Sequence, residues 1–116
     1  MKILIADDEK EVAELIKKWL DRRGYNADLA FDGGKALELI KLNNYDLIFV
    51  DHNMPEVTGL ELIVYIKQNS PATKTAMITG YPHIAEFAAK ELGADEYLTK
   101  PVKLEEIEDI IDKYKK

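Results

Sequence analysis

Short apolar runs alternate with longer amphipathic stretches along the whole chain, and this alternation constrains the fold more than any other feature of the sequence. Nearly continuous apolar runs at residues 3–6, 47–50 and 76–79 are typical of strands buried on both faces of a parallel sheet. Residues 26–31 alternate instead, with Ala27, Leu29 and Phe31 on one side, which predicts an edge strand. A short fifth strand is expected around Tyr97 and Leu98.

Stretches with apolar residues at helical spacing lie between these runs. The clearest is an i, i+3, i+4, i+7, i+8 stripe that ends before Gly24 and consists of Val12, Leu15, Ile16, Trp19 and Leu20. Similar stripes recur at residues 36–40, 60–66, 84–88 and 104–114. Five strands and five helices in strict alternation, joined by right-handed crossovers, predict an α/β fold: a doubly wound (βα)5 sandwich around a parallel sheet.

Length and composition limit the class of protein. The 116 residues contain no linker, repeat or low-complexity tract, so we expect one domain over residues 1–116. The absence of cysteine excludes a disulfide scaffold, a thiolate zinc site and a thiol nucleophile. Sixteen basic against 22 acidic residues give a net charge of -6, so no direct nucleic-acid partner is expected.

No segment of the sequence is expected to enter a membrane. The apolar run at the start ends at Asp7, which is too early for a signal peptide. No later run approaches the ~18 residues that a membrane-spanning helix needs. We therefore expect a soluble, cytoplasmic protein without membrane insertion.

Polar residues follow the strands at the points where they end. In open α/β sheets ligands bind beyond the carboxyl ends of the strands, so these side chains are expected to meet at one edge: Asp7, Asp8, Asp51, Thr79 and Lys100. Clustered carboxylates repel one another unless a cation neutralises them. Magnesium suits a shallow site with few carboxylates better than calcium does, and Lys100 supplies a second positive charge.

Phosphoryl transfer is the chemistry that this set of groups favours. Its transition state spreads negative charge over oxygens that a metal ion and an ammonium group stabilise. An aspartate can act as the nucleophile and form an aspartyl-phosphate. Asp51 is the better candidate, because it follows a fully buried strand and precedes a turn, whereas Asp7 and Asp8 are adjacent and can share the metal.

Several motifs, in this order, resemble the receiver (CheY-like) domain of bacterial two-component response regulators. They are Asp7-Asp8, residues 51–55 with the following Gly59, Thr79, and residues 97–101. The resemblance covers essentially the whole chain. It implies a flavodoxin-like fold with strand order 2-1-3-4-5 and a regulatory phosphoacceptor rather than an enzyme, one that catalyses only its own phosphorylation and slow autodephosphorylation.

The resemblance also implies roles for individual residues. Asp51 is the implied phosphoacceptor, and Asp7, Asp8, Asp51 and the backbone carbonyl of Asn53 would hold Mg2+, for which Mn2+ can substitute. Thr79 and Lys100 would bind the phosphoryl oxygens. Tyr97 would be the switch residue that turns inward when Thr79 moves, and Lys100–Pro101 would be a cis peptide, which is uncommon for X-Pro bonds.

The implied partners are a sensor histidine kinase or a phosphotransfer protein, and an unknown downstream target. The target would bind the surface formed by the fourth helix, the fifth strand and the fifth helix. The first helix, with Val12, Leu15, Ile16 and Trp19, would dock the kinase in addition to packing on the sheet. The resemblance implies that Asn53 and Tyr81, two residues after Asp51 and Thr79, flank the path of the attacking water, so we expect Asn53 to permit hydrolysis and Tyr81 to shield the phosphoryl group in part.

Other interpretations remain open at this stage. Taken alone, Asp7-Asp8 can be a helix cap and first-turn acid, Asp51 a turn acid, and Lys100-Pro101 a surface turn. A magnesium-dependent aspartate-nucleophile phosphatase would carry a second aspartate where Asn53 stands, and a flavodoxin-like flavin binder would carry a Ser/Thr/Gly-rich loop in place of Asp7-Asp8. A degenerate interaction module is a further alternative.

Some features of the chain stay unassigned. His52 and His83 receive no role, because no third metal ligand lies near either of them in sequence. The chain can be a single-domain regulator, a phosphorelay intermediate, or the excised receiver of a transcription factor.

Overall fold

The computed structural model describes residues 1–115, and their fold is the predicted alternation of strands and helices. The strands are β1 (Lys2–Ala6), β2 (Asn26–Ala30), β3 (Leu47–Asp51), β4 (Lys74–Thr79) and β5 (Glu96–Thr99). The helices are α1 (Lys10–Arg22), α2 (Gly33–Leu42), α3 (Gly59–Asn69), α4 (Pro82–Glu91) and α5 (Leu104–Tyr114). All neighbouring strands are parallel and their order is β2-β1-β3-β4-β5, so the predicted fold class and strand order are confirmed.

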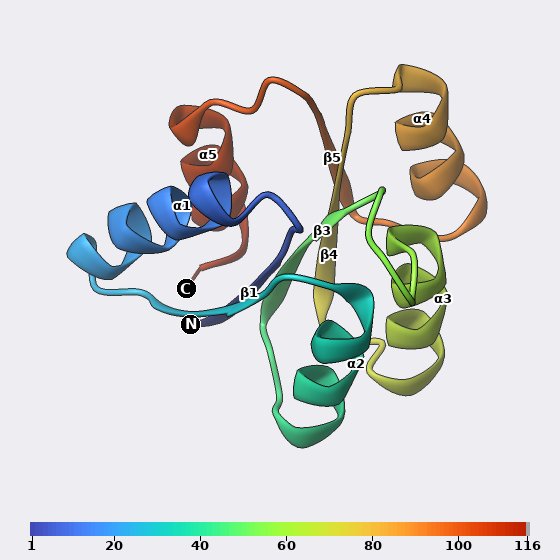
Figure 1. Ribbon diagram of the computed structural model, residues 1–116, viewed down its shortest axis with the longest axis horizontal. Helices are drawn as coiled ribbons and strands as arrows, with labels where there is room; N and C mark the ends of the chain where they lie inside the picture. Colours follow the sequence, from blue (N-terminus) through green and yellow to red (C-terminus); the bar gives the residue numbers. More distant parts are fainter. Residues whose placement is uncertain (116) are drawn as a thin grey trace.

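Helices cover both faces of the sheet, as Figure 1 shows: α1 and α5 lie together on one face and α2 and α3 on the other. Successive residues of a strand point to opposite faces, so the continuous apolar runs feed two cores. The core beside α1 and α5 includes Ile3, Ile5, Phe49, Ile16, Leu20, Ile107 and Ile111. The opposite core includes Leu4, Val50, Ala36, Ile40, Leu62 and Ile66, and α4 adds a third cluster around Met77 and Ala88.

The central strands place the candidate residues at one edge of the sheet. Every residue of β3 is buried, and burying one large aliphatic side chain stabilises the fold by roughly 1.5–3 kcal/mol. The register pairs Ala6 with Val50 and Asp51 with Ile78. Asp7, Asp51 and Thr79 therefore lie within about one residue of each other along the strand direction.

Two details of the predicted elements differ from the structure. The apolar stripe on α1 is wider than the face that the helix buries. Ile16 and Leu20 are buried, whereas Val12 is 41% and Leu15 59% exposed. β4 begins at Lys74, two residues before the predicted strand, because the polar but fully buried Thr75 extends it.

The ends of the helices follow local signals in the sequence. Gly24, at φ +84°, adopts the left-handed conformation just after α1, as a glycine in that position readily does. α3 begins with a capping box in which Thr58 and Glu61 satisfy each other's backbone N–H groups. Among residues 1–115, no helix combines the length and the hydropathy needed to cross a bilayer.

Candidate functional site

Three carboxylates meet where β1 and β3 end. Asp7 and Asp8 follow β1 directly, and Asp51 is the last residue of β3. One oxygen atom from each of the three lies within 4.8 Å of the others. Asp7 and Asp51 are buried whereas Asp8 is exposed, so the cluster opens to solvent on one side.

Asp51 has an electrostatic environment that favours a cation. Burial and the nearby Asp7 carboxylate raise its pKa to about 7, against the partly compensating charge of Lys100. Burial also raises the pKa of Asp7. Oδ2 of Asp51 is buried without a hydrogen-bond partner among the described residues. An all-oxygen donor set with an orphaned buried oxygen fits a divalent cation such as Mg2+.

Lys100 extends into this cluster from the end of β5. Its Nζ lies 3.2 Å from Oδ1 of Asp51 and donates a hydrogen bond of 2.8 Å to Oε1 of Glu9. Burial alone would lower the pKa of Lys100, but the hydrogen bond to Glu9 and the Asp51 charge outweigh it and raise that pKa. The Lys100–Pro101 peptide bond is cis, as the resemblance implied.

Thr79 and Tyr97 lie on the neighbouring strands β4 and β5, and their side chains differ greatly in exposure. Thr79 is 1% exposed, and its hydroxyl oxygen accepts a hydrogen bond of 3.1 Å from the backbone N–H of Tyr81. Its carbonyl oxygen accepts from the backbone N–H of Lys100 at 2.9 Å, which joins the ends of β4 and β5. Tyr97 is 52% exposed and points away from the core.

The loop between β3 and α3 is held tightly against Asp51. A side chain at Gly59 would put its Cβ 2.3 Å from the carbonyl oxygen of Asp51, so only glycine permits this approach. Glu56 adopts φ 68°, the left-handed region that L residues rarely enter. Asn53 is exposed and Met54 is buried, so the loop is anchored in the core by one side chain while its neighbour faces solvent.

The structure brings together most of the predicted site residues and adds one. Asp7, Asp8, Asp51 and Lys100 converge, whereas Asn53 and Tyr81 lie exposed. The sequence did not identify Glu9, whose carboxylate contacts Lys100; the only signal was a third acid after Asp7-Asp8.

The structure also shows which residue caps α1 and where the two histidines lie. The N-cap residue of α1 is Glu9, without a side-chain cap bond, so Asp8 does not cap this helix. His52 and His83 each lie edge-on to Tyr81, with ring centroids 6.2 and 6.1 Å apart.

Comparisons with known proteins agree with this site. Residues 3–112 match the family model of the response regulator receiver domain. The chain is 35% identical over 108 residues to the transcriptional regulatory protein DltR of Streptococcus agalactiae, covering 92% of this chain and 48% of that protein. It is also 35% identical over 108 residues to the response regulator MprA of a Mycobacterium strain, covering 92% and 47%.

Solved structures of similar proteins share the fold. The receiver domain of the Francisella response regulator 1452 superimposes with a TM-score of 0.90 at 32% identity, covering 97% of this chain and 94% of that one. The response regulator TrrA of Thermotoga maritima, solved with Mg2+ and BeF, gives 0.85 at 33% identity and 98% coverage of both chains.

Fold and site together define a parallel α/β domain with an acidic, metal-compatible cluster at the carboxyl edge of its sheet. The chain belongs to the response regulator receiver domain family of two-component systems. As a receiver domain it is a regulatory module rather than a classical enzyme. It spans about half the length of the curated relatives it matches.

Proposed function

We propose that this receiver domain accepts a phosphoryl group on Asp51 from the phosphohistidine of a sensor histidine kinase or phosphotransfer protein. In the proposal Asp7, Asp8, Asp51 and the backbone carbonyl of Asn53 hold Mg2+, with Mn2+ as a substitute. The observation that carries the proposal is the buried Oδ2 of Asp51, which has no partner in the described part of the chain while Lys100 lies 3.2 Å from Oδ1.

The chemistry assigned to the chain is a displacement at phosphorus. An oxygen of Asp51 forms the new P–O bond as the P–N bond of the donor breaks, and the imidazole leaves with the electron pair. When bound, Mg2+ would neutralise the developing charge on the phosphoryl oxygens. Lys100 remains ionised throughout because its pKa is raised, so it supplies a fixed positive charge at the same oxygens.

The output step in the proposal is a change of side-chain orientation. Thr79 exchanges its bond with the Tyr81 backbone for one to a phosphoryl oxygen, and the exposed Tyr97 turns inward. The surface formed by α4, β5 and α5 then changes its affinity for a downstream target. Such a switch requires only that phosphorylation favours one of two existing conformations.

Asn53 and Tyr81 are proposed to set the lifetime of the phosphorylated state. Both are exposed beside the site, where Asn53 can orient a water molecule and the ring of Tyr81 covers part of the approach. Replacing Tyr81 with alanine should therefore speed autodephosphorylation, measured as loss of the phosphoryl mass after the donor is removed. An unchanged rate would remove Tyr81 from this role.

The proposed docking site of the kinase is the exposed apolar side of α1. Val12 and Ile16 line a groove of about 440 Å3 whose walls also include Pro101, Val102, Asp7 and Lys100. A partner seated there would bring its phosphohistidine to Asp51. Leu15, on the same helix, is 59% exposed and would add to this surface.

The central test uses acetyl phosphate as donor. The protein is incubated with acetyl phosphate and Mg2+, and its intact mass is measured. We expect the mass to increase by one phosphoryl group in the wild type and not in Asp51→Ala, and the increase to be lost when EDTA removes the metal. A gain that persists in Asp51→Ala would refute the assignment of the phosphoacceptor.

The expectation of no nucleic-acid partner concerns this 116-residue chain alone. Relatives about twice as long carry names such as transcriptional regulatory protein. If this domain is part of a longer protein of that kind, we propose that its phosphorylation controls transcription through the rest of that protein.

A further inference from the structure

β5 has few of the interactions that normally fix the register of a strand. It is a four-residue edge strand paired only with β4, and Leu98, at 8% exposure, is its one buried apolar side chain. A slip of one residue moves every side chain of a strand to the opposite face. Since β5 carries Tyr97 and leads into Lys100, its register decides where both side chains lie.

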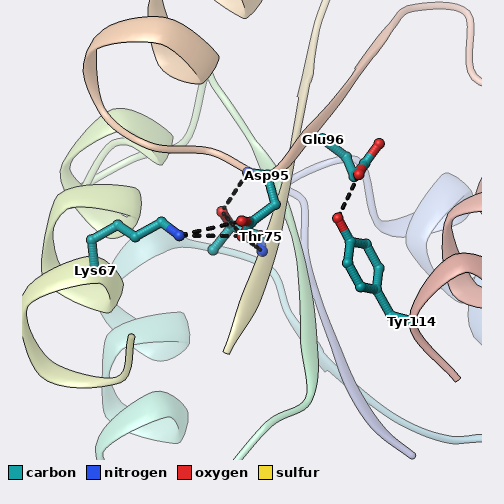
Figure 2. A network of polar contacts seen from close by, with 5 residues as sticks. All are labelled: Lys67, Thr75, Asp95, Glu96 and Tyr114. Atoms are coloured by element: carbon teal, nitrogen blue, oxygen red, sulfur yellow. Dashed lines mark hydrogen bonds and ion pairs between the residues drawn. The ribbon is translucent and has the colours of Figure 1, made fainter. Parts of the chain in front are cut away.

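On the face toward α3, Asp95 ties the start of β5 to two elements (Figure 2). Its carboxylate accepts hydrogen bonds from the backbone N–H of Thr75 at 2.9 Å and from Nζ of Lys67 at 3.3 Å. Its own backbone N–H donates to the carbonyl oxygen of Thr75 at 3.0 Å. Asp95, which directly precedes β5, is therefore bonded to both β4 and α3.

On the opposite face, the next residue makes an equivalent attachment to α5. The carboxylate of Glu96 accepts a short hydrogen bond from the hydroxyl of Tyr114, drawn in Figure 2, and another of 2.8 Å from Nζ of Lys113. Burial and the Glu96 carboxylate raise the pKa of Tyr114, so its hydroxyl stays protonated as a donor. Adjacent residues thus bind both helical layers of the protein.

Burial makes these contacts selective for one register. The side chain of Asp95 is 19% exposed and that of Glu96 18%, whereas Thr75 is fully buried. A partly buried carboxylate without its donors is strongly unfavourable. A slip of one residue could bring at most one of these acids to the donors that now serve the other, and it would leave the remaining acid without donors.

We propose that Asp95 and Glu96 form a two-sided clamp and act as positioning residues for Tyr97 and Lys100. The inference rests on the proposed function, because it assigns the clamp to the placement of a phosphoryl-binding lysine. Lys100 lies five residues after Asp95, about 16 Å along an extended chain. The clamp fixes the position of Asp95 and Glu96 at the start of this segment. Lys100, at its end, therefore keeps its distance from Asp51.

The test compares two tyrosine–carboxylate pairs of the same chemistry. Tyr114→Phe and Asp95→Asn loosen the clamp, singly and together. Tyr45→Phe is the matched control, because the hydroxyl of Tyr45 donates to Asp28 at 2.7 Å beside β2, on the far edge of the sheet. Phosphorylation by acetyl phosphate and Mg2+ is followed by intact mass at a temperature where circular dichroism shows every variant folded.

We expect the double variant to be phosphorylated about tenfold more slowly than the wild type, because even a 1 Å misplacement of a catalytic group can cost up to about 100-fold. Tyr114→Phe alone should lose about threefold, and Tyr45→Phe less than twofold. In a Lys100→Ala background the clamp substitutions should add less than a further twofold, since they act through that lysine. A wild-type rate in the folded Tyr114→Phe and double variants, or an equal loss without Lys100, overturns the inference.

Amide hydrogen exchange separates a failure of this inference from a failure of the proposed function. If the wild type takes up no phosphoryl group, the proposed function fails, and the clamp is then judged from the backbone amides of residues 97–100. Faster exchange of these amides in Asp95→Asn than in Tyr45→Phe supports the clamp. Equal exchange in the two variants overturns it.

Discussion

Replacing Asp51 with asparagine is expected to stabilise the metal-free protein at neutral pH, although it removes the central side chain of the site. Asp51 is 1% exposed, and its pKa is about 7 in the folded chain against an ordinary value of 3.8. A tenfold change in proton affinity corresponds to about 1.4 kcal/mol. The ionised carboxylate therefore destabilises the fold by up to about 4 kcal/mol, a penalty that a neutral amide of similar shape avoids.

The pH dependence follows from the same difference. Because the pKa of Asp51 is higher in the folded chain, the folded chain binds more protons than the unfolded chain between about pH 4 and pH 7. The free energy of unfolding of the wild type should therefore rise by about 1 kcal/mol as the pH falls from 8 to 6. Asp51→Asn should lack most of this rise.

Urea denaturation in EDTA measures the stability gained by Asp51→Asn and, when repeated at different pH, the pH dependence of the wild type. With a slope of about 2 kcal/mol per molar urea, the midpoint of Asp51→Asn should lie about 1–2 M above that of the wild type at pH 7.5. Mg2+ at ten times its dissociation constant should stabilise the wild type by about 1.4 kcal/mol and the variant much less. Asp109→Asn, an exposed carboxylate on α5, is the control and should change stability by less than about 0.5 kcal/mol. Equal or lower stability of Asp51→Asn in EDTA would refute the electrostatic argument.

The loop between β3 and α3 gives three further predictions, each measured by urea denaturation. Gly59→Ala should lower the free energy of unfolding by about 2–3 kcal/mol, because the new Cβ meets the Asp51 carbonyl oxygen at 2.3 Å. An unchanged urea midpoint would show that α3 can move away freely. Thr58→Ala should lose about 1 kcal/mol with its capping box, and a loss below a few tenths would mean that water replaces the cap. Glu56→Val should lower the free energy of unfolding by about 1–2 kcal/mol although Glu56 is exposed, because a β-branched residue is strained at φ 68°. Glu56→Gly should not destabilise the fold. A larger loss for Glu56→Gly than for Glu56→Val would contradict the argument from strain.

The sequence was sufficient for the fold and for the convergence of the site, because both depend on patterns that local physics enforces. Parallel strands align their carboxyl ends, so residues that follow three separate apolar runs must meet once the alternation is recognised. The cis bond before Pro101 was implied only by the resemblance, and the structure confirms it.

The contacts that the sequence could not predict are those made by side chains from distant segments. Glu9 reaches Lys100 across 91 positions of the chain, and no periodicity indicates such a pair. The predicted fourth strand begins at residue 76 because the polar Thr75 lies just before the apolar run, yet in the structure Thr75 is fully buried and bonded to Asp95. The division of the α1 stripe into buried Ile16 and exposed Leu15 depends on how α5 and the sheet edge share the space, which one helix alone does not specify.

The dispersal of the site over the chain has a consequence for biosynthesis. Its acidic groups come from the first half of the chain, whereas Thr79 and Lys100 come from the second. During synthesis from the amino terminus, β1 and β3 can pair before β5 exists, but at that stage Asp51 has no ammonium group beside it. Under the proposed function, the ability to accept a phosphoryl group therefore appears only after the last strand has docked, so an unfinished or partly unfolded chain would be phosphorylated poorly.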